Sequence, residues 1–125
     1  MSDPESDDFV RFVLDRAGEA VRSVVRYDAD ASEVLFLRDD VADTYSPLTI
    51  ETVVTSLRRE GEQSQRQEHL YAHGQLNCIV RCFDGGLEMH FPFGEEEGVA
   101  VALEPRAAQQ LYSFVDDCLE HVEAG

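Results

Sequence analysis

Lysine is absent from this chain of 125 residues, and so is tryptophan. All 10 basic side chains are arginines, against 26 acidic ones, so the formal net charge is −16 at neutral pH. At low ionic strength such a charge destabilises a compact chain by self-repulsion, whereas at about 1 M salt the screening length falls to about 3 Å. The aliphatic part of a lysine side chain adds apolar surface, and high salt strengthens hydrophobic association of such surface, which disfavours lysine. The composition therefore predicts a protein adapted to a salt-saturated cell interior.

The scarcity of cations also excludes a class of partner. Binding to a phosphate backbone requires arginine and lysine gathered on one face, but here the arginines are dispersed among a large excess of carboxylates. Acidic tails and nucleic-acid mimics carry their charge in blocks, whereas the longest acidic run in this chain is 95–97. We therefore expect no nucleic-acid partner.

Long hydrophobic runs are missing too. No apolar stretch approaches the roughly 18 residues of a membrane span, and the start, MSDPESDD, lacks the basic and apolar regions of a signal peptide. Three cysteines, an odd number, favour a reducing compartment over a disulfide framework. We expect a cytoplasmic protein with no membrane partner. Length and a hydrophobic content of 43% predict a single domain over 1–125, with 1–5 disordered.

Apolar periodicity predicts the elements in the first part of the chain. Ser6 is a helix cap, and the helix that follows it ends at Gly18. Residues 20–27 and 33–38 are rich in β-branched side chains and flank a polar turn, so we expect a hairpin. A turn or short helix covers 39–45.

A middle helix begins at Ser46 and Pro47, which are typical of a cap and a first helical position. Its apolar residues recur with helical spacing on one face, and we expect it to run over 46–60. Residues 61–68 are polar, include three glutamines and show neither helical nor strand periodicity, so we predict a loop there.

Three strands and a helix complete the chain. The first strand lies within 70–83 and is bent at Gly74. Apolar and polar residues alternate over 87–93, which predicts the second strand, and 99–103 is the third. A last helix begins at Pro105. Its apolar residues, which we expect to face the core, are Ala108, Leu111, Phe114, Val115, Cys118, Leu119 and Val122.

The resulting order is α-β-β-α-β-β-β-α, an α+β domain with a five-stranded antiparallel sheet and helices on both faces. It resembles the Roadblock and longin-like architecture, in which the first and last helices pack on one sheet face and the middle helix on the other. In that family two copies usually pair through the middle helix and the third strand, and most members bind small GTPases or act as scaffolds. A profilin-like sensor domain is the alternative fold. The Roadblock resemblance implies a homodimer interface at Ile50, Val53, Val54, Leu57 and Ile79.

A second resemblance covers most of the chain. The stretches RSVVRYDADASEVLFLRDDVADTY, LYAHGQLNCIVRCF and LEMHFPFGEEEGVAVALEP are similar to a group of uncharacterised small haloarchaeal proteins. This resemblance implies a halophilic archaeal source and carries no activity with it.

Several cations fall inside the predicted strands. Arg22 and Arg26 alternate, so a regular strand places them on one face. They either form an ion-pair lattice with carboxylates such as Glu33 and Glu88, or they bind an anion. The candidate anion-binding residues are Arg22, Arg26, Arg81 and His90.

Cysteines and histidines close in sequence raise two further possibilities. His69, His73, Cys78 and Cys82 are residue types that bind zinc, but on a strand the two cysteines are separated by about 13 Å, too far for one ion. Either cysteine with His90 and Asp84 makes a nucleophilic site only in one strand register. There is no phosphate loop or nucleophile elbow. We expect no enzyme, no catalytic residue, no metal and no cofactor.

Two functions remain open. The first is a non-catalytic interaction or scaffold module that acts as a homodimer and binds a nucleotide-binding or signalling protein. The second is a small-molecule sensor whose pocket, between the sheet and the middle helix, is lined by the arginines. The first requires an exposed apolar patch on the middle helix or a free strand edge, and the second requires an enclosed pocket with an arginine that is not ion-paired.

Overall fold

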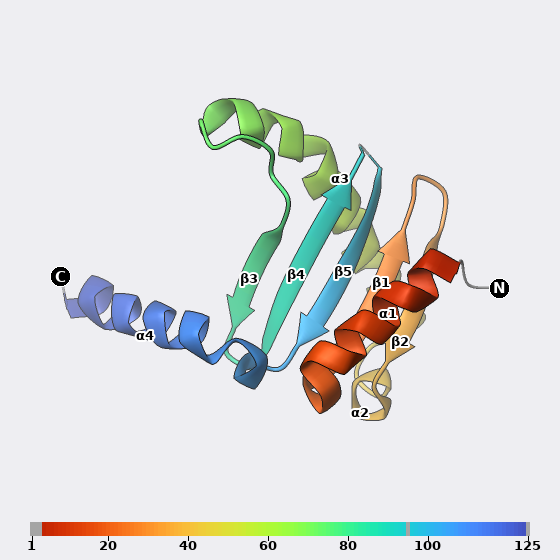
Figure 1. The fold of residues 1–125 in the computed structure, drawn as a ribbon, viewed down its shortest axis with the longest axis horizontal. Helices are drawn as coiled ribbons and strands as arrows, with labels where there is room; N and C mark the ends of the chain where they lie inside the picture. Colours follow the sequence, from red (N-terminus) through yellow and green to blue (C-terminus); the bar gives the residue numbers. More distant parts are fainter. Residues whose placement is uncertain (1–3, 95, 125) are drawn as a thin grey trace.

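The computed structural model describes residues 4–94 and 96–124 (Figure 1). The helices are α1 (Pro4–Ala17), α2 (Asp39–Ala42), α3 (Pro47–Leu70) and α4 (Gln109–Ala124). The strands are β1 (Val21–Tyr27), β2 (Ser32–Leu37), β3 (Ile79–Phe83), β4 (Gly86–Phe93) and β5 (Glu97–Leu103). Short 3-10 helices, Gly18–Ala20 and Pro105–Ala108, precede β1 and α4.

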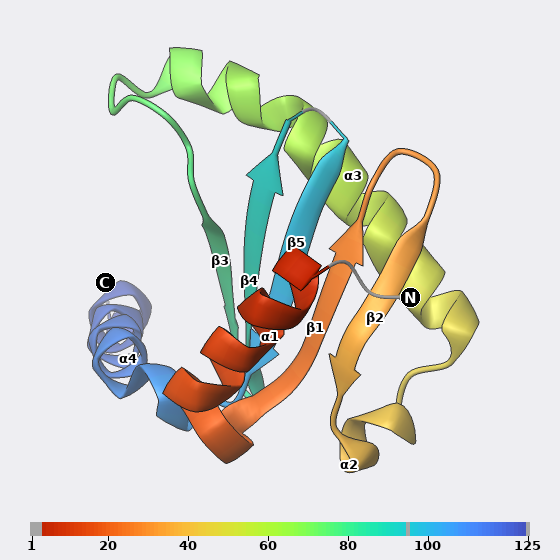
Figure 2. The same ribbon diagram turned by 45° about the vertical axis from the view of Figure 1, so that its right-hand side comes forward.

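The five strands form one antiparallel sheet in the order β2-β1-β5-β4-β3, so β2 and β3 are its edges. Helix α1 packs on one face and α3 crosses the other, as Figure 2 shows. The expected α+β class and five-stranded antiparallel sheet are confirmed.

Each face of the sheet has its own apolar cluster. On the α1 face, Val24 and Val101 belong to a cluster that also includes Val13 of α1. On the α3 face, Tyr27 packs with Val54 and Leu57 of α3. The sheet is thus buried from both sides at its centre, where β1 and β5 pair.

The first helix agrees closely with the helix expected from the apolar periodicity of the sequence. Helix α1 ends at Ala17, and Gly18 has a φ of 56°, a left-handed conformation that glycine adopts without strain. The helix begins at Pro4 rather than Ser6. Residues 1–3, part of the segment expected to be disordered, lie outside the described part.

The predicted loop over 61–68 is wrong, because α3 continues to Leu70. Its start is as expected, with the Ser46 side chain accepting a hydrogen bond from the backbone N–H of Thr49 at 3.2 Å. The glutamines and glutamates of 61–68 are good helix formers. Gly61 and Ser64 are buried and extend the stripe that Val54 and Leu57 begin. Hydrophobic periodicity misses such a stripe, since its last members are small rather than apolar.

The predicted strand within 70–83 is shorter than expected. Only Ile79–Phe83 pairs with β4, and the chain before it turns at Gly74, where φ is 85°. The hairpin of β4 and β5 matches the alternation, although β5 begins at Glu97 rather than Val99. A helical segment begins at Pro105 as expected, with the 3-10 turn Pro105–Ala108 leading into α4.

Helix α4 is correctly placed along the chain, but the expectation that its apolar residues face the core is wrong for most of them, Ala108 being the one that packs on the core cluster. Phe114 is 68% exposed and Val122 is 73% exposed. The helix extends away from the sheet from its first turn onward (Figure 1). Periodicity identifies the apolar face of a helix, but it does not determine which surface covers that face.

Candidate functional site

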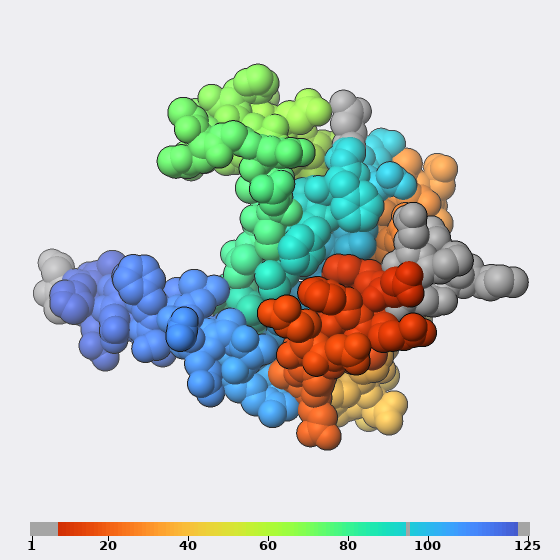
Figure 3. All heavy atoms as spheres, viewed as in Figure 1, coloured from red at the N-terminus to blue at the C-terminus, as the bar shows by residue number. Residues whose placement is uncertain are grey.

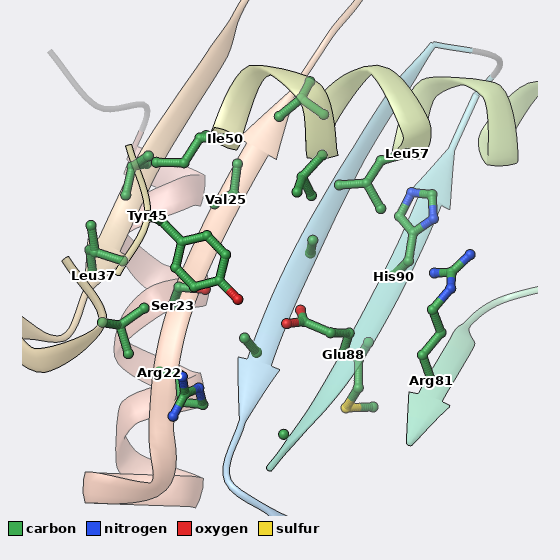
Figure 4. Close-up of a pocket in the computed structure, with 18 of the residues that line it drawn as sticks. Arg22, Ser23, Val25, Leu37, Tyr45, Ile50, Leu57, Arg81, Glu88 and His90 are labelled. Carbon is green, nitrogen blue, oxygen red and sulfur yellow. The ribbon is translucent and has the colours of Figure 1, made fainter. Parts of the chain in front are cut away.

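A pocket of about 500 Å³ lies on the α3 face of the sheet, between β1, β5 and β4 on one side and α2, α3 and the segment joining them on the other (Figure 4). Ala100, Ala102 and Val25 contribute small and apolar side chains from the sheet. The apolar residues of the opposite wall are Val41, Ile50, Val53, Val54 and Leu57. A pocket of this size and character fits a small amphipathic molecule.

Polar side chains gather along the β1, β4 and β3 side of this pocket. Glu88 lies between Arg22 and Arg81, and its side chain points toward the middle of the pocket, as that of Tyr45 does from the opposite side (Figure 4). His90 lines the pocket beneath Leu57. The arrangement combines an apolar chamber with a short row of charged groups.

His90 is the centre of a buried hydrogen-bond chain. Its Nε2 lies 2.6 Å from the Tyr27 hydroxyl, and its Nδ1 lies 2.6 Å from Oε1 of Glu60 on α3. His90 and Tyr27 are each only 1% exposed. The chain therefore ties β1 and β4 to α3 through the interior of the domain.

The chemistry of the partners determines the position of the protons. An ionised Glu60 can only accept, so Nδ1 of His90 donates to it, and Nε2 accepts the Tyr27 O–H. Burial, reinforced by the Arg81 charge, lowers the pKa of His90 to about 4, and burial raises the pKa of Tyr27 to about 12. Both groups are neutral at physiological pH, and every polar atom of the chain has a partner.

Gly98 allows Tyr27 to reach His90. In the sheet register Tyr27 of β1, Gly98 of β5 and Pro92 of β4 lie side by side. A Cβ on Gly98 would lie 2.7 Å from Cζ and 2.8 Å from Cε1 of Tyr27, closer than side chains approach one another. The tyrosine ring thus crosses over β5 at the one position where that strand has no side chain.

Arg81 is paired within the subunit. Its guanidinium binds Glu60, with Nη1 donating to Oε1 at 3.2 Å and Nη2 to Oε2. Glu60 therefore accepts from both Arg81 and His90. This ion pair holds α3 to the β3 edge of the sheet and leaves Arg81 little capacity for a ligand.

Arg22 is placed differently. It lies in an irregularity of the β1–β5 ladder between Val21 and Ser23, and it lines the pocket. Among the described residues it forms no ion pair, although its charge lowers the pKa of Asp40 slightly, after the direct bonds from Arg38 to that carboxylate. Arg22 is thus a half-buried cation at the pocket that is available to an anion.

The expectation that Arg22 and Arg26 share a face is wrong. Arg26 lies opposite Val99, which belongs to the cluster under α1, whereas Arg22 lines the pocket under α3. The register shift between Val21 and Ser23, where Arg22 is the extra residue of β1, breaks the alternation that the sequence suggests. In the sheet Arg26 lies opposite Glu33, the carboxylate expected as a partner.

Glu88 is a partly buried acid beside Arg22. Burial raises its pKa, and the charges of Arg22 and Arg81 act in the opposite direction. Its carboxylate forms no hydrogen bond or ion pair with another described residue. It therefore presents an acceptor to the pocket close to the available cation.

Residues 7–123 match the family model described as a domain of unknown function (DUF7522). This chain belongs to that family. A comparison with curated proteins found no match to the DUF7522 chain. No helix in the described part of it combines the length and apolar character that crossing a bilayer requires.

The pairing of Cys82 with His90 considered from the sequence does not assemble in this DUF7522 chain. Cys82 lies opposite Leu87 in the β3–β4 ladder, and His90 lies opposite Ile79. Cys82 therefore lies on the α1 face, while His90 lies on the α3 face. Across the described residues no group of histidine, cysteine or carboxylate side chains is arranged to hold a metal ion.

The residues expected at a dimer interface have separate positions in the DUF7522 fold. Val54 and Leu57 are buried against Tyr27, and Ile50 packs beside them. Val53 is 46% exposed, and Ile79 is half-buried on the β3 edge.

Sequence reasoning identified three of the pocket residues, Arg22, Arg81 and His90, but missed Tyr27, Glu60 and Gly98. Tyr27 was at the end of a predicted strand, and Glu60 was at the predicted end of a helix. Nothing in the sequence distinguishes a glycine over which a ring passes from a glycine in a loop. The strand order β1-β5-β4 is what brings these three residues together.

Proposed function

We propose that this domain is a non-catalytic binding module whose pocket takes a small amphipathic molecule with a carboxylate. The observation that carries the proposal is Arg22, a cation at an apolar pocket of about 500 Å³ with no ion-pair partner among the described residues. An available arginine beside an apolar chamber is the arrangement that holds a carboxylate on an apolar body.

Glu88 narrows the class of ligand. Its carboxyl faces the same part of the pocket as Arg22, so a ligand whose carboxylate meets the guanidinium brings its neighbouring atoms to Glu88. A hydroxyl or amino group at that position would donate to Glu88. Hydroxy acids and amino acids with an apolar side chain are the ligands that satisfy both groups.

His90 supports binding rather than catalysis. Both of its ring nitrogens are engaged within the subunit, and its pKa of about 4 makes it a weak base. In this proposal the Tyr27–His90–Glu60 chain holds the α3 wall of the pocket at a fixed distance from the sheet.

A panel of probes in molar KCl tests the proposal: octanoate, 3-phenyllactate, phenylalanine and the neutral octanol. Binding would be measured by thermal shift and by titration calorimetry. We expect the three carboxylates to bind more tightly than octanol, with 3-phenyllactate and phenylalanine gaining from Glu88. Arg22→Gln should weaken carboxylate binding at least tenfold, which is about 1.4 kcal/mol.

The matched control is Arg26→Gln, because Arg26 lies on the opposite face of the same strand. Removing the same charge there should leave the affinities unchanged. Equal losses in both variants, or no binding by any carboxylate, would exclude the proposed ligand class.

A protein-interaction function is the second candidate, and separate observations favour it. Leu48 on α3 is exposed, as Val53 is, and β3 is an edge strand of the sheet that the described residues form. The placement of α1 and α3 on opposite faces supports a Roadblock-like relationship, although α4 departs from it by leaving the sheet. This function implies a homodimer through α3 and β3 that binds a nucleotide-binding or signalling protein.

Affinity capture in molar KCl tests this second candidate. It predicts enrichment of a GTPase or ATPase that is lost on Val53→Glu and kept on Glu51→Gln, a change at another exposed position of α3. Recovery of the bait alone would rule out a stable partner.

We further infer that the protein works in the cytoplasm of a halophilic archaeon. The net charge of −16 and the absence of lysine support this source. Exposed carboxylates are distributed over α1, α2 and α4 rather than gathered at one site. Such a surface is stable where salt screens its repulsion.

A further inference from the structure

Helix α4 carries an apolar stripe that the rest of the described residues leave exposed. Leu111, Phe114, Leu119 and Val122 recur at helical spacing and are all exposed. On the opposite side of the helix lie Ser113 and the carboxylate of Glu120. An amphipathic helix of 16 residues with an exposed apolar side is typical of a helix that packs against another surface.

The direction of α4 is fixed at its first turns. The Tyr112 hydroxyl lies 2.7 Å from the carbonyl oxygen of Gly86 and 2.9 Å from that of Phe83, at the turn between β3 and β4. Tyr112 and Ala108 also pack on the α1-side cluster. Beyond this anchor the helix leaves the sheet, so its stripe and its own sheet do not meet (Figure 1).

A second uncovered apolar surface lies on the same chain. Val80 and Cys82 of β3 lie opposite Met89 and Leu87 of β4, on the same sheet face as α1. Helix α1 reaches as far as β4, where Phe9 contacts Phe91. Val80 and Cys82 are exposed. Phe93, which lies two residues after Phe91 on β4, is exposed as well. We name the exposed part of this surface, Val80, Cys82 and Phe93 with the half-buried Met89, the β3–β4 strip.

The stripe and the strip resemble each other in chemistry and differ from the rest of the molecule. Neither contains a charged residue, in a chain with a net charge of −16. Figure 3 shows the surface hollowed between α4 and the end of α3, with β3 at the base of the hollow. The hollow lies directly beside the strip and is open to a second molecule.

We propose that two copies of the chain associate reciprocally, each laying the apolar stripe of its α4 on the β3–β4 strip of the other. A second copy is the occupant that supplies both surfaces at once, because each chain has one of each and a two-fold axis pairs them. A single helix packed on a single strip makes a small interface. In the reciprocal dimer this helix–strip contact occurs twice, so the buried area doubles. Molar salt favours the association, since it screens the acidic surfaces and strengthens apolar burial.

Two natural cysteines allow a direct test, because Cys118 lies on the stripe and Cys82 lies on the strip, and both are exposed and free. In a Cys78→Ser background, a Cys82→Ser copy is mixed in molar KCl with a tagged Cys118→Ser copy and a short bismaleimide. The mixture allows a stripe-to-strip link only between chains. We expect the covalent heterodimer to be the main product.

The Cys78→Ser variant that keeps both Cys82 and Cys118 tests whether the stripe and the strip of one chain meet each other instead. A link within one chain, seen as a cross-linked product of monomer mass, would mean that α4 folds onto its own sheet and would overturn the proposal. A mixture that yields no heterodimer would overturn it as well.

Light scattering with two matched variants tests the energetics. Val122→Glu places a charge on the stripe at a position that is already 73% exposed, so it should not impair folding of the subunit. Ser113→Glu adds the same charge to the other side of α4. We expect Val122→Glu to weaken dimerisation at least tenfold and Ser113→Glu to leave it unchanged. A monomeric parent protein, or equal effects of the two variants, would contradict the proposed interface.

Discussion

The hydroxyl of Tyr27 lies 2.6 Å from Nε2 of His90, although the two residues belong to strands that β5 separates. Gly98 makes this possible, because the tyrosine ring occupies the space that a side chain on β5 would fill. The contact continues through Glu60 to α3, so one hydrogen-bond chain joins β1, β4 and that helix. The pocket lies beside this chain.

Gly98→Ala should destabilise the protein by about 1–3 kcal/mol, the usual effect of overpacking a well-packed core. The new methyl group meets the ring of Tyr27 and forces it away from His90. Urea unfolding in molar KCl measures the change. Gly85→Ala is the control, since a Cβ there meets nothing within 4 Å and its φ is not positive. Equal stability of the two variants would mean that Tyr27 moves without cost.

Tyr27→Phe should cost about 1–3 kcal/mol, because it leaves Nε2 of His90 buried without its donor. Unfolding in denaturant measures this loss. The double variant Tyr27→Phe with His90→Phe should recover part of it, because no polar atom is then left unpaired. Additive losses in the double variant would show that the two residues do not interact.

The stability of the protein should fall as pH falls from about 6.5 to about 4. The folded-state pKa of His90 is lowered to about 4, so the unfolded chain binds a proton in this window and the folded one does not. The contribution of His90 is fully present above the window and is lost through it, with an upper limit of about 3 kcal/mol. His90→Gln should flatten the stability profile between pH 5 and 6.5. An unchanged slope in that variant would assign the effect to other groups.

Glu88→Gln should stabilise the protein at neutral pH. Burial raises the folded-state pKa of Glu88, so the ionised carboxylate is disfavoured in the folded protein and stability falls as pH rises through the carboxyl range. The gain should vanish at acidic pH, where the carboxyl is protonated in both states. Thermal melts of the variant and the parent at two pH values measure this difference. A loss of stability at neutral pH would mean that Arg22 and Arg81 outweigh burial.

The folded protein should require salt. A net charge of −16 destabilises the compact state when the screening length is long. We expect the free energy of unfolding to rise steadily with KCl toward the molar range. A maximum of stability at low salt would contradict an origin in a salt-saturated cytoplasm.

The sequence was most informative where one residue determines a local structure. Gly18 ends α1, and Ser46 and Pro47 begin α3, as their chemistry requires. It was least informative where the outcome depends on contacts between distant residues. The small residues Gly61 and Ser64 are buried in a helix that was expected to be a loop, and a bulge at Arg22 in β1 places Arg26 on the face opposite Arg22.

The candidate site was predicted in part for the same reason. Arg22, Arg81 and His90 were candidates because polar residues inside strands are unusual. Which of them is available depends on Glu60, since that carboxylate accepts hydrogen bonds from both Arg81 and His90. No local sequence pattern predicts that Glu60 of α3 pairs with residues of β3 and β4, which lie many residues later in the chain.

The most direct measurement of the central claim is an NMR titration of the labelled protein with 3-phenyllactate in molar KCl. The account predicts that backbone amides lining the pocket, those of Ser23, Ala100 and Ala102, shift on binding in the parent protein and in Arg26→Gln. In Arg22→Gln these shifts should be absent at the same concentrations. Shifts that persist in Arg22→Gln, or that map to the β3–β4 strip instead, would contradict a carboxylate-binding pocket.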